Sequence, residues 1–325
     1  YKLGVTTAAG ARNAIDAALE FANEREQFSR SITKFDMIKA KFATMVARTW
    51  EAENVNYMTC GSIDRSIDLL DRNADDYYIQ MQKVIEDHSV EASITKVIGS
   101  EALAYVVDEC VQIMGGAGFI EEYGMATLYR DERINRIFEG TNEINRLLIS
   151  SMLLKKSILE ELPVRDAISL REDDWFSEYA VSDSILDKYI KITEYMRSAS
   201  LFMLNSLINK YGQDFKNNQW VIEPYSNMVC ALSIVDTALK RLGKVEGKDT
   251  FEKFYELFEL SVCQQYSQFN RQMDKIMSHI FELESEVKIG FVQKNRNSLD
   301  YKPDEIELMK NVAERLYKHG RYYLD

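Results

Sequence analysis

The scarcity of proline constrains the fold of this chain more than any other feature of its sequence. Only Pro163, Pro224 and Pro303 occur among 325 residues. Because proline disrupts helix interiors, the long proline-free stretches leave room for long helices. Apolar residues recur along them at intervals of three and four, which is typical of amphipathic helices, and no set of strand-like segments is found. We therefore predict an all-α fold.

The apolar patterns also predict where the helices lie. A first helix ends near Arg25, and a loop follows as far as Thr33. Phe35 starts the pattern of a second long helix, and Gly115 ends that of a third. These helices and the one after Gly140 predict an up-and-down four-helix bundle. Other helices are expected at about 126–134, 185–212, 220–242, 251–280 and 304–317.

A polar, poorly periodic stretch divides the chain. Between Glu160 and Asp174 the residues are mostly charged and include Pro163, which is typical of a connector. We predict a first helical domain over residues 1–159, a connector over 160–174 and a second helical bundle over 175–325. The second bundle contains no recognisable chemical motif.

Charge and composition exclude several classes of function. Acidic residues number 52 against 40 basic ones, a net charge of −12, which argues against a nucleic-acid partner. The four cysteines are widely spaced and the three histidines are isolated, so we expect reduced cysteines, no metal site and no Ser-His-Asp triad. No apolar run reaches the roughly 18 residues that a membrane span needs. A soluble protein is therefore expected.

Candidate functional residues gather between Gln112 and Arg146. Gly115 and Gly116 lie where a helical pattern stops, and glycine permits both a positive φ and the close approach of a ligand. The structural alternative is that these glycines merely end a helix.

A second candidate feature is the carboxylate of Glu139, which precedes Gly140 and a predicted helix start. A glycine hinge at a helix entrance can aim such a carboxylate at a ligand. Thr141 and Glu143 would lie in the first helical turn, where Thr141 could equally be a simple N-cap and the acidic residues simply favourable to the helix dipole.

Four motifs in order resemble the C-terminal part of the acyl-CoA dehydrogenases. They are Arg-x-Gln-Phe from Arg25, Gln-x-x-Gly-Gly-x-Gly-Phe from Gln112, Arg-Asp-x-Arg-Ile from Arg130 and Ile-Phe-Glu-Gly-Thr-x-Glu-Ile-x-Arg from Ile137. The resemblance covers about residues 1–156. The helical region after it resembles the additional C-terminal domain of the long-chain and very-long-chain type. We therefore expect part of a longer protein, without the family's N-terminal helical domain and middle β-domain.

The resemblance implies FAD-dependent oxidation of an acyl-CoA to the enoyl-CoA in fatty acid β-oxidation. Glu139 would be the base that removes the α-proton, and Gly140 would lie against the substrate. A homodimer or higher homo-oligomer is implied, because two of the FAD-binding segments reach the cofactor of a neighbouring subunit. The FAD-binding residues implied are Arg25, Gln27 and Phe28 at the diphosphate, Gln112, Gly115 and Gly116 at the adenosine, and Thr141 and Glu143 at the flavin.

Two residues depart from the family pattern, and two alternatives stay open. Ser29 stands where the family usually has glycine, and Gly124 replaces a common proline. The chain could instead resemble an acyl-CoA oxidase, or it could be a non-catalytic assembly module that associates peripherally with membranes through its C-terminal domain. For the dehydrogenase, the family implies an electron-transferring flavoprotein as acceptor, and the bacterial cytoplasm is expected ahead of the mitochondrial matrix.

Overall fold

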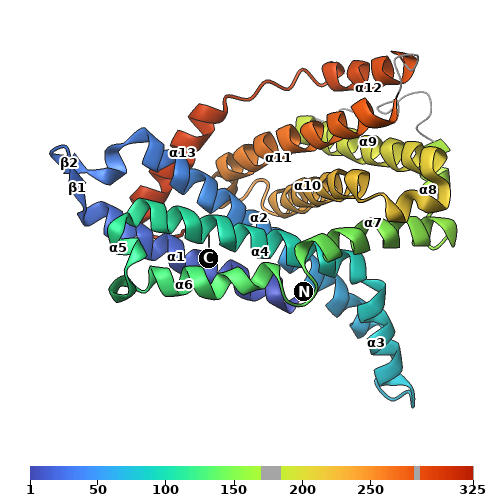
Figure 1. Cartoon of the computed structure of the whole chain (residues 1–325), viewed down its shortest axis with the longest axis horizontal. Helices are drawn as coiled ribbons and strands as arrows, with labels where there is room; N and C mark the ends of the chain where they lie inside the picture. Colours follow the sequence, from blue (N-terminus) through green and yellow to red (C-terminus); the bar gives the residue numbers. More distant parts are fainter. Residues whose placement is uncertain (170–183, 282–285, 325) are drawn as a thin grey trace. The chain divides into compact units, whose positions relative to one another are not determined.

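The computed structural model describes residues 1–169, 184–281 and 286–324 (Figure 1). Helices dominate these residues, and the sheet found among them has two short strands. The prediction of an all-α fold is confirmed. None of the described helices is both long enough and apolar enough to cross a lipid bilayer. The chain forms two compact units: unit 1 holds Tyr1–Asn145, Val245–Ser261 and Asp304–Asp325, and unit 2 holds Arg146–Lys244 and Val262–Pro303.

Most of the short elements belong to unit 1. Its elements are α1 (Lys2–Glu24), β1 (Glu26–Gln27), β2 (Arg30–Ser31), η1 (Ile32–Lys34), α2 (Asp36–Asp68), α3 (Tyr77–Asp87), α4 (Ser89–Met114), α5 (Gly116–Phe119), η2 (Glu121–Tyr123), α6 (Met125–Arg133), η3 (Ile134–Arg136) and α13 (Glu305–His319).

Unit 2 is also helical in its described residues. It contains α8 (Val164–Ser169), α9 (Asp187–Tyr211), η4 (Gly212–Asn217), α10 (Gln219–Gly243) and α12 (Glu286–Ser298). Two helices have residues in both units: α7 (Asn142–Ile158) and α11 (Phe251–Ile280).

Three helices of unit 1 alternate in direction, as an up-and-down bundle requires. The hydroxyl of Thr59, late in α2, lies 3.0 Å from that of Thr95, early in α4. Earlier in α2, the guanidinium of Arg48 lies 4.3 Å from the ring centre of Tyr105, later in α4. These pairs show that α2 and α4 are antiparallel, while α1 runs beside α4 in the same direction (Figure 1).

Small residues let α1 and α4 approach closely. A Cβ built on Gly4 would stand 2.5 Å from the methyl group of Thr95, and one built on Gly99 would stand 2.9 Å from the Cα of Gly4. Farther along the pair, the thiol of Cys110 lies 3.3 Å from the carbonyl oxygen of Ala14. Glycines at positions 4 and 99 thus allow the close packing of the two helices.

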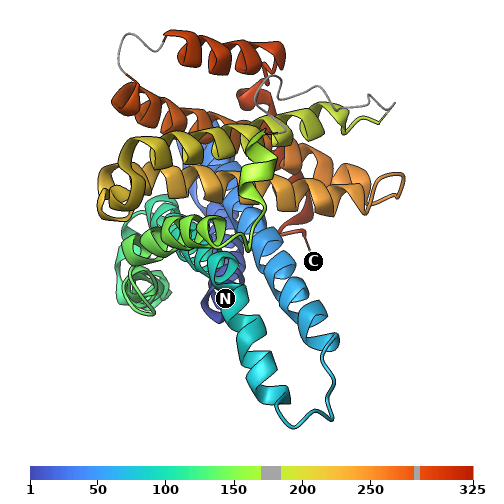
Figure 2. The ribbon, with the colours of Figure 1, turned by 90° about the vertical axis from the view of Figure 1, so that its right-hand side faces the viewer.

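The end of α2 and the separate helix α3 form a hairpin (Figure 2). The sequence predicts a turn here, followed by one long helix. The structure instead ends α3 at Asp87 and begins α4 at Ser89. No residue of α3 is buried, so α3 contributes little to the core of unit 1.

Residues near the C-terminus complete the core of unit 1. The ring of Tyr317 in α13 lies 5.8 Å from that of Phe42 in α2, and Asp16 accepts a hydrogen bond of 2.6 Å from the backbone of Tyr322. Unit 1 thus draws residues from both sides of the predicted connector, of which residues 170–174 lie outside the described part of the chain. The predicted domain boundaries stay a prediction.

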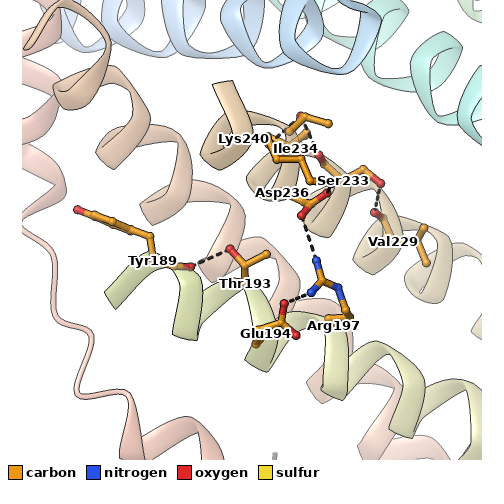
Figure 3. Close-up of polar contacts among 10 residues, drawn as sticks. Tyr189, Thr193, Glu194, Arg197, Val229, Ser233, Ile234, Asp236 and Lys240 are labelled. Carbon is orange, nitrogen blue, oxygen red and sulfur yellow. Dashed lines mark hydrogen bonds and ion pairs between the residues drawn. The ribbon is translucent and has the colours of Figure 1, made fainter. Parts of the chain in front are cut away.

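Charged side chains join the first two long helices of unit 2 (Figure 3). Arg197 of α9 pairs with Glu194 on its own helix and, at 3.0 Å, with Asp236 of α10. Lys240 lies 2.6 Å from the other oxygen of Asp236. The side chains of Arg197, Asp236 and Lys240 are partly exposed.

Candidate functional site

The predicted catalytic carboxylate lies on a short irregular segment between η3 and α7, residues 137–141, which we call the hinge. Glu139 has a φ of 55° and Gly140 a φ of 77°. Two consecutive left-handed residues reverse the chain sharply, and this conformation is costly for a residue with a side chain. A glycine at position 140 is therefore required by the turn, and Glu139 is held in a strained conformation.

Side chains of α4 and α7 hold the carbonyl groups of the hinge. The ammonium group of Lys96 donates hydrogen bonds to the carbonyl of Gly140 at 2.8 Å and to the side-chain oxygen of Asn142 at 2.6 Å. The amide of Asn145 donates to the carbonyls of Gly140 at 2.8 Å and Thr141 at 3.0 Å. Lys96, Asn142 and Asn145 are all buried. We call these three side chains the clamp.

The hinge borders a cavity of about 490 Å³ within unit 1. Glu139 and Phe138 line one part of it, Lys96 another, and the first residues of α1 complete the wall. Because Glu139 is exposed while lining this cavity, its carboxylate can reach a molecule that enters. The residues that line the cavity are Tyr1, Lys2, Leu3, Thr6, Ala92, Ser93, Lys96, Phe138, Glu139 and Asn145.

The structural roles considered for Thr141 and Gly115 are both present. The hydroxyl of Thr141 accepts a hydrogen bond of 3.3 Å from the backbone of Ile144, as an N-cap does. Gly115 has a φ of 59° and ends α4. Glu143 is exposed in the first turn of α7. An N-cap oxygen can also donate its proton, so the cap does not prevent Thr141 from binding a ligand.

The loop expected after α1 forms a small β-hairpin. Glu26 pairs with Ser31 and Gln27 with Arg30. Phe28 and Ser29 turn the hairpin with φ values of 52° and 63°, as in a type I′ turn. A residue that adopts this conformation easily is glycine, which explains why the family usually has glycine where this chain has Ser29.

The three predicted binding side chains of the hairpin segment are exposed to solvent. The ring of Phe28 is 88% exposed, and Arg25 and Gln27 are exposed as well. In the described part of the chain, the side chains of Arg25 and Gln27 form no hydrogen bond or ion pair. A guanidinium in this state suits a phosphate group.

The glycine turn after α4 is open on one side. A Cβ built on Gly115 or Gly116 would meet nothing within 4 Å, whereas one on Gly118 would stand 2.9 Å from the Cβ of Met114. Gly118 is therefore needed for packing, while Gly115 and Gly116 leave their backbone accessible to a ligand. Gln112 is exposed beside them. We call the hairpin residues Arg25–Phe28 and the turn residues Gln112–Gly116 the cradle.

The cradle and the hinge lie at opposite ends of the α1–α4 pair (Figure 1). The hairpin follows the last residue of α1, near which the rings of Phe21 and Tyr123 lie 6.2 Å apart. Glu139 instead shares a cavity with the first residues of α1. The 23 residues of α1 separate the two groups by about 30 Å, given a rise of about 1.5 Å per residue. One chain cannot bring both groups to the same reacting atoms.

The clamp was not predicted from the sequence. Lys96 precedes Val97 and Ile98 in a stretch of α4, residues 92–100, that has no other charged residue. A lysine is rarely buried without partners. The position of a lysine inside such a stretch was therefore the one signal in the sequence that could have indicated the clamp. Its partners are more than forty residues away, so the sequence did not identify them.

The sequence and the structure of this chain are similar to those of known proteins. Residues 2–154 match the family model described as acyl-CoA dehydrogenase, C-terminal domain. A Bacillus subtilis (strain 168) protein named "Probable acyl-CoA dehydrogenase" is 35% identical over 261 residues, which cover 78% of this chain and 43% of that protein. The human mitochondrial very long-chain specific acyl-CoA dehydrogenase is 37% identical over 150 residues, covering 46% of this chain and 20% of that protein.

A solved structure resembles the whole chain. The crystal structure of an acyl-CoA dehydrogenase from Bacillus anthracis complexed with FAD matches with a TM-score of 0.91 at 28% sequence identity, and the match covers 100% of this chain and 56% of that one. The chain thus spans about half the length of the bacterial relatives it matches. Acyl-CoA dehydrogenases bind FAD. The chain belongs to the acyl-CoA dehydrogenase family, of which it carries the C-terminal helical domain.

Proposed function

We propose that this chain supplies the catalytic base and part of the FAD site of an acyl-CoA dehydrogenase. The observation that carries the proposal is the hinge: Glu139 is held in a left-handed conformation at the wall of a 490 Å³ cavity, and buried side chains fix the carbonyls around it. A carboxylate that is held in place and can reach the interior of a cavity is suited to removing a proton from a bound molecule.

The reaction removes two hydrogens from adjacent carbons of an acyl-CoA. Bound FAD supplies a hydride acceptor for the β-hydrogen. Glu139 accepts the α-proton, and the electron pair of the broken α-carbon–hydrogen bond forms the new double bond. Gly140, next to the base, would lie against the substrate. Since the hinge is fixed before the substrate arrives, little reorganisation is needed when the proton moves.

The cradle residues have the donor chemistry that FAD requires. Arg25 offers a guanidinium to a diphosphate, Gln27 and Gln112 offer amides, and the exposed ring of Phe28 offers a stacking surface. The backbone of Gly115 and Gly116 is open to close approach. Thr141 is the last residue of the hinge and Glu143 lies in the first turn of α7, and both would contact the flavin end.

The separation of cradle and hinge supports a site that is shared between subunits. In this proposal, each FAD takes its base from one chain and its cradle contacts from another. A homodimer is the smallest assembly in which every site is complete, and higher homo-oligomers built from such dimers satisfy the same requirement.

Anaerobic reduction of the flavin tests Glu139 as the base. In the full-length FAD-loaded protein, a long-chain acyl-CoA should bleach the flavin absorbance. Glu139→Gln should slow this bleaching by about 10²-fold or more, with FAD content unchanged. Glu122→Gln, a neutralised carboxylate in η2 outside hinge and cradle, is the matched control and should behave as wild type. If the flavin of Glu139→Gln is bleached at the wild-type rate, Glu139 is not the base.

Chain length, pathway and electron acceptor belong to the same proposal. The similarity to a very long-chain enzyme supports a long acyl chain, and oxidation of such a substrate is a step of fatty acid β-oxidation. An electron-transferring flavoprotein is the proposed acceptor. Rapid oxygen consumption without an added acceptor would instead identify the oxidase alternative. Peripheral membrane association, an assembly role for the C-terminal helices and the cellular compartment stay predictions.

A further inference from the structure

Lys96 is a buried charge in a part of α4, residues 92–100, that has no other charged residue. The residue is 4% exposed, and burying an ammonium group is unfavourable unless hydrogen-bonding partners replace its water. The partners include the carbonyl oxygen of Gly140 at 2.8 Å and the side-chain oxygen of Asn142 at 2.6 Å. Both belong to the segment that carries the proposed base. The ammonium group therefore ties α4 to the hinge.

The other two clamp residues, Asn142 and Asn145, also form hydrogen bonds at or beside the hinge. Asn142 also donates to Ser100 at 3.0 Å and to Glu101 at 3.1 Å, both on α4. These bonds fix the side-chain oxygen that Lys96 contacts. Asn145 lies within hydrogen-bonding distance of the carbonyls at positions 139, 140 and 141. The carbonyl groups of Gly140 and Thr141 are thus held by buried side chains.

The backbone that these bonds hold would not keep its shape unaided. Glu139 has a side chain and a φ of 55°, a conformation that persists only where surrounding contacts determine it. If the carbonyl of Gly140 were released, Glu139 could relax to a negative φ. Its carboxylate would then project from the hinge in a different direction.

We propose that Lys96 is the positioning residue of Glu139: from α4 it holds the Gly140 carbonyl and Asn142, and so fixes the backbone conformation from which the base projects. This inference rests on the proposed function, in which Glu139 removes the α-proton. Lys96 acts through the hinge, because its ammonium group donates to the carbonyl of Gly140 and to the side chain of Asn142, the residue directly after the hinge. Lys96 therefore affects the rate of proton removal more than it affects the binding of the substrate.

Lys96→Met in the full-length FAD-loaded protein tests the proposal. Methionine keeps the length of the side chain and removes the charge. The rate of flavin reduction at saturating acyl-CoA should fall about 100-fold, the loss typical of a group displaced by about 1 Å. The dissociation constant of the acyl-CoA should change by less than about threefold, since binding does not depend on the aim of the base. FAD content should be unchanged.

Hydrogen exchange supplies a readout that does not depend on turnover. Backbone amides of residues 137–146 should exchange faster in Lys96→Met, while those of the hairpin at 25–31 should not change. Lys41→Met is the matched control, because Lys41 pairs with Glu109 of α4 and touches no hinge residue. It should match wild type in both measurements.

The outcomes separate this inference from the proposed function. If Glu139→Gln stops flavin reduction while Lys96→Met reduces flavin at the wild-type rate, the positioning role is wrong and the base assignment stands. If Glu139→Gln itself reduces flavin at full rate, the proposed function is wrong. A loss in Lys96→Met that merely follows lost FAD or weakened acyl-CoA binding would also overturn the positioning role.

If Lys96→Met does not fold, Asn142→Ala provides a second test of the proposal. It removes the acceptor 2.6 Å from the ammonium group and leaves the buried charge bonded to Gly140. The rate of flavin reduction should then fall about tenfold with little change in acyl-CoA affinity. A wild-type rate in this variant would contradict the proposal.

Discussion

Gly99 of α4 meets Gly4 of α1 with no room for a side chain: a Cβ on Gly99 would stand 2.9 Å from the Cα of Gly4 and 2.6 Å from the hydroxyl of Thr7. Gly99→Ala must therefore separate the two helices. We expect the free energy of unfolding to fall by about 1–3 kcal/mol, as overpacking of a core usually costs. Denaturant unfolding followed by circular dichroism measures this loss.

Gly61→Ala is the control for the helix interior itself. A Cβ there would meet only the guanidinium of Arg65, at 3.7 Å. Alanine stabilises a helix by up to about 1 kcal/mol relative to glycine, so this variant should be at least as stable as wild type. Equal destabilisation by both substitutions would contradict a role for Gly99 in helix contact.

Long helices could be predicted from the sequence because their apolar patterns extend over many turns. The expected segments 220–242 and 251–280 correspond closely to α10 and α11. Helix α12 was not predicted, because Lys294, Asn295 and Arg296 interrupt its apolar pattern. Packing within unit 2 stabilises α12 instead: Val292 is fully buried.

The hinge could be predicted from the sequence, whereas the clamp could not. Glu139 and Gly140 are adjacent in the sequence, so a local motif was sufficient to identify the hinge. Lys96 and Gly140 are far apart in the sequence and meet only after α4 and the hinge have folded together in unit 1. Sequence patterns report local periodicity and turn chemistry, and neither reveals which carbonyl a distant lysine will bind.

A buried tyrosine connects three helices of unit 2. The hydroxyl of Tyr195 donates to the side-chain oxygen of Asn270 at 2.9 Å and accepts from the guanidinium of Arg296 at 3.2 Å. Tyr195→Phe removes both bonds and leaves the side-chain oxygen of the buried Asn270 without this donor. We expect a loss of about 1–3 kcal/mol in the free energy of unfolding, measured by denaturant titration. Tyr78→Phe, at a position 76% exposed, should change nothing measurable, and equal effects would disprove the role of the Tyr195 hydroxyl.

Glu132 should make stability depend on pH. The residue is 2% exposed, and its Oε2 atom has no hydrogen-bond partner in the described part of the chain. Burial raises the pKa of Glu132, although the nearby Arg136 opposes the shift. The folded protein therefore binds this proton more tightly than the unfolded chain does. The contribution of Glu132 to stability is largest below its unfolded pKa and declines as pH rises through the folded pKa.

Glu132→Gln removes this titration. Between about pH 4 and pH 7, a range that starts near the ordinary glutamate pKa, the unfolding free energy of the variant should rise relative to wild type. Glu121→Gln is the control of opposite sign, because hydrogen bonding to Arg130 lowers the pKa of the exposed Glu121. The unfolding free energy of Glu121→Gln should fall slightly relative to wild type over the same pH range. A constant difference between Glu132→Gln and wild type would contradict the assignment.

Arg25 and Glu139 lie at opposite ends of α1, so a shared FAD site predicts complementation between subunits. In a dimer of one Arg25→Met chain and one Glu139→Gln chain, one site carries both defects and the other carries neither. Each homodimer has a defect in every site. The purified mixed dimer should therefore show about half the wild-type rate of acyl-CoA-dependent flavin reduction, as expected for one intact site of two.

Differently tagged chains, coexpressed and purified through both tags, provide the mixed dimer for this measurement. The two homodimers are assayed beside it and should both be nearly inactive, Arg25→Met because it loses FAD affinity and Glu139→Gln because it lacks the base. A dimer that carries both substitutions on the same chain, paired with a wild-type chain, places one defect in each site and should be as inactive as the homodimers. Half activity in that arrangement, with none in the mixed dimer, would show that each FAD takes its base and its arginine from one chain.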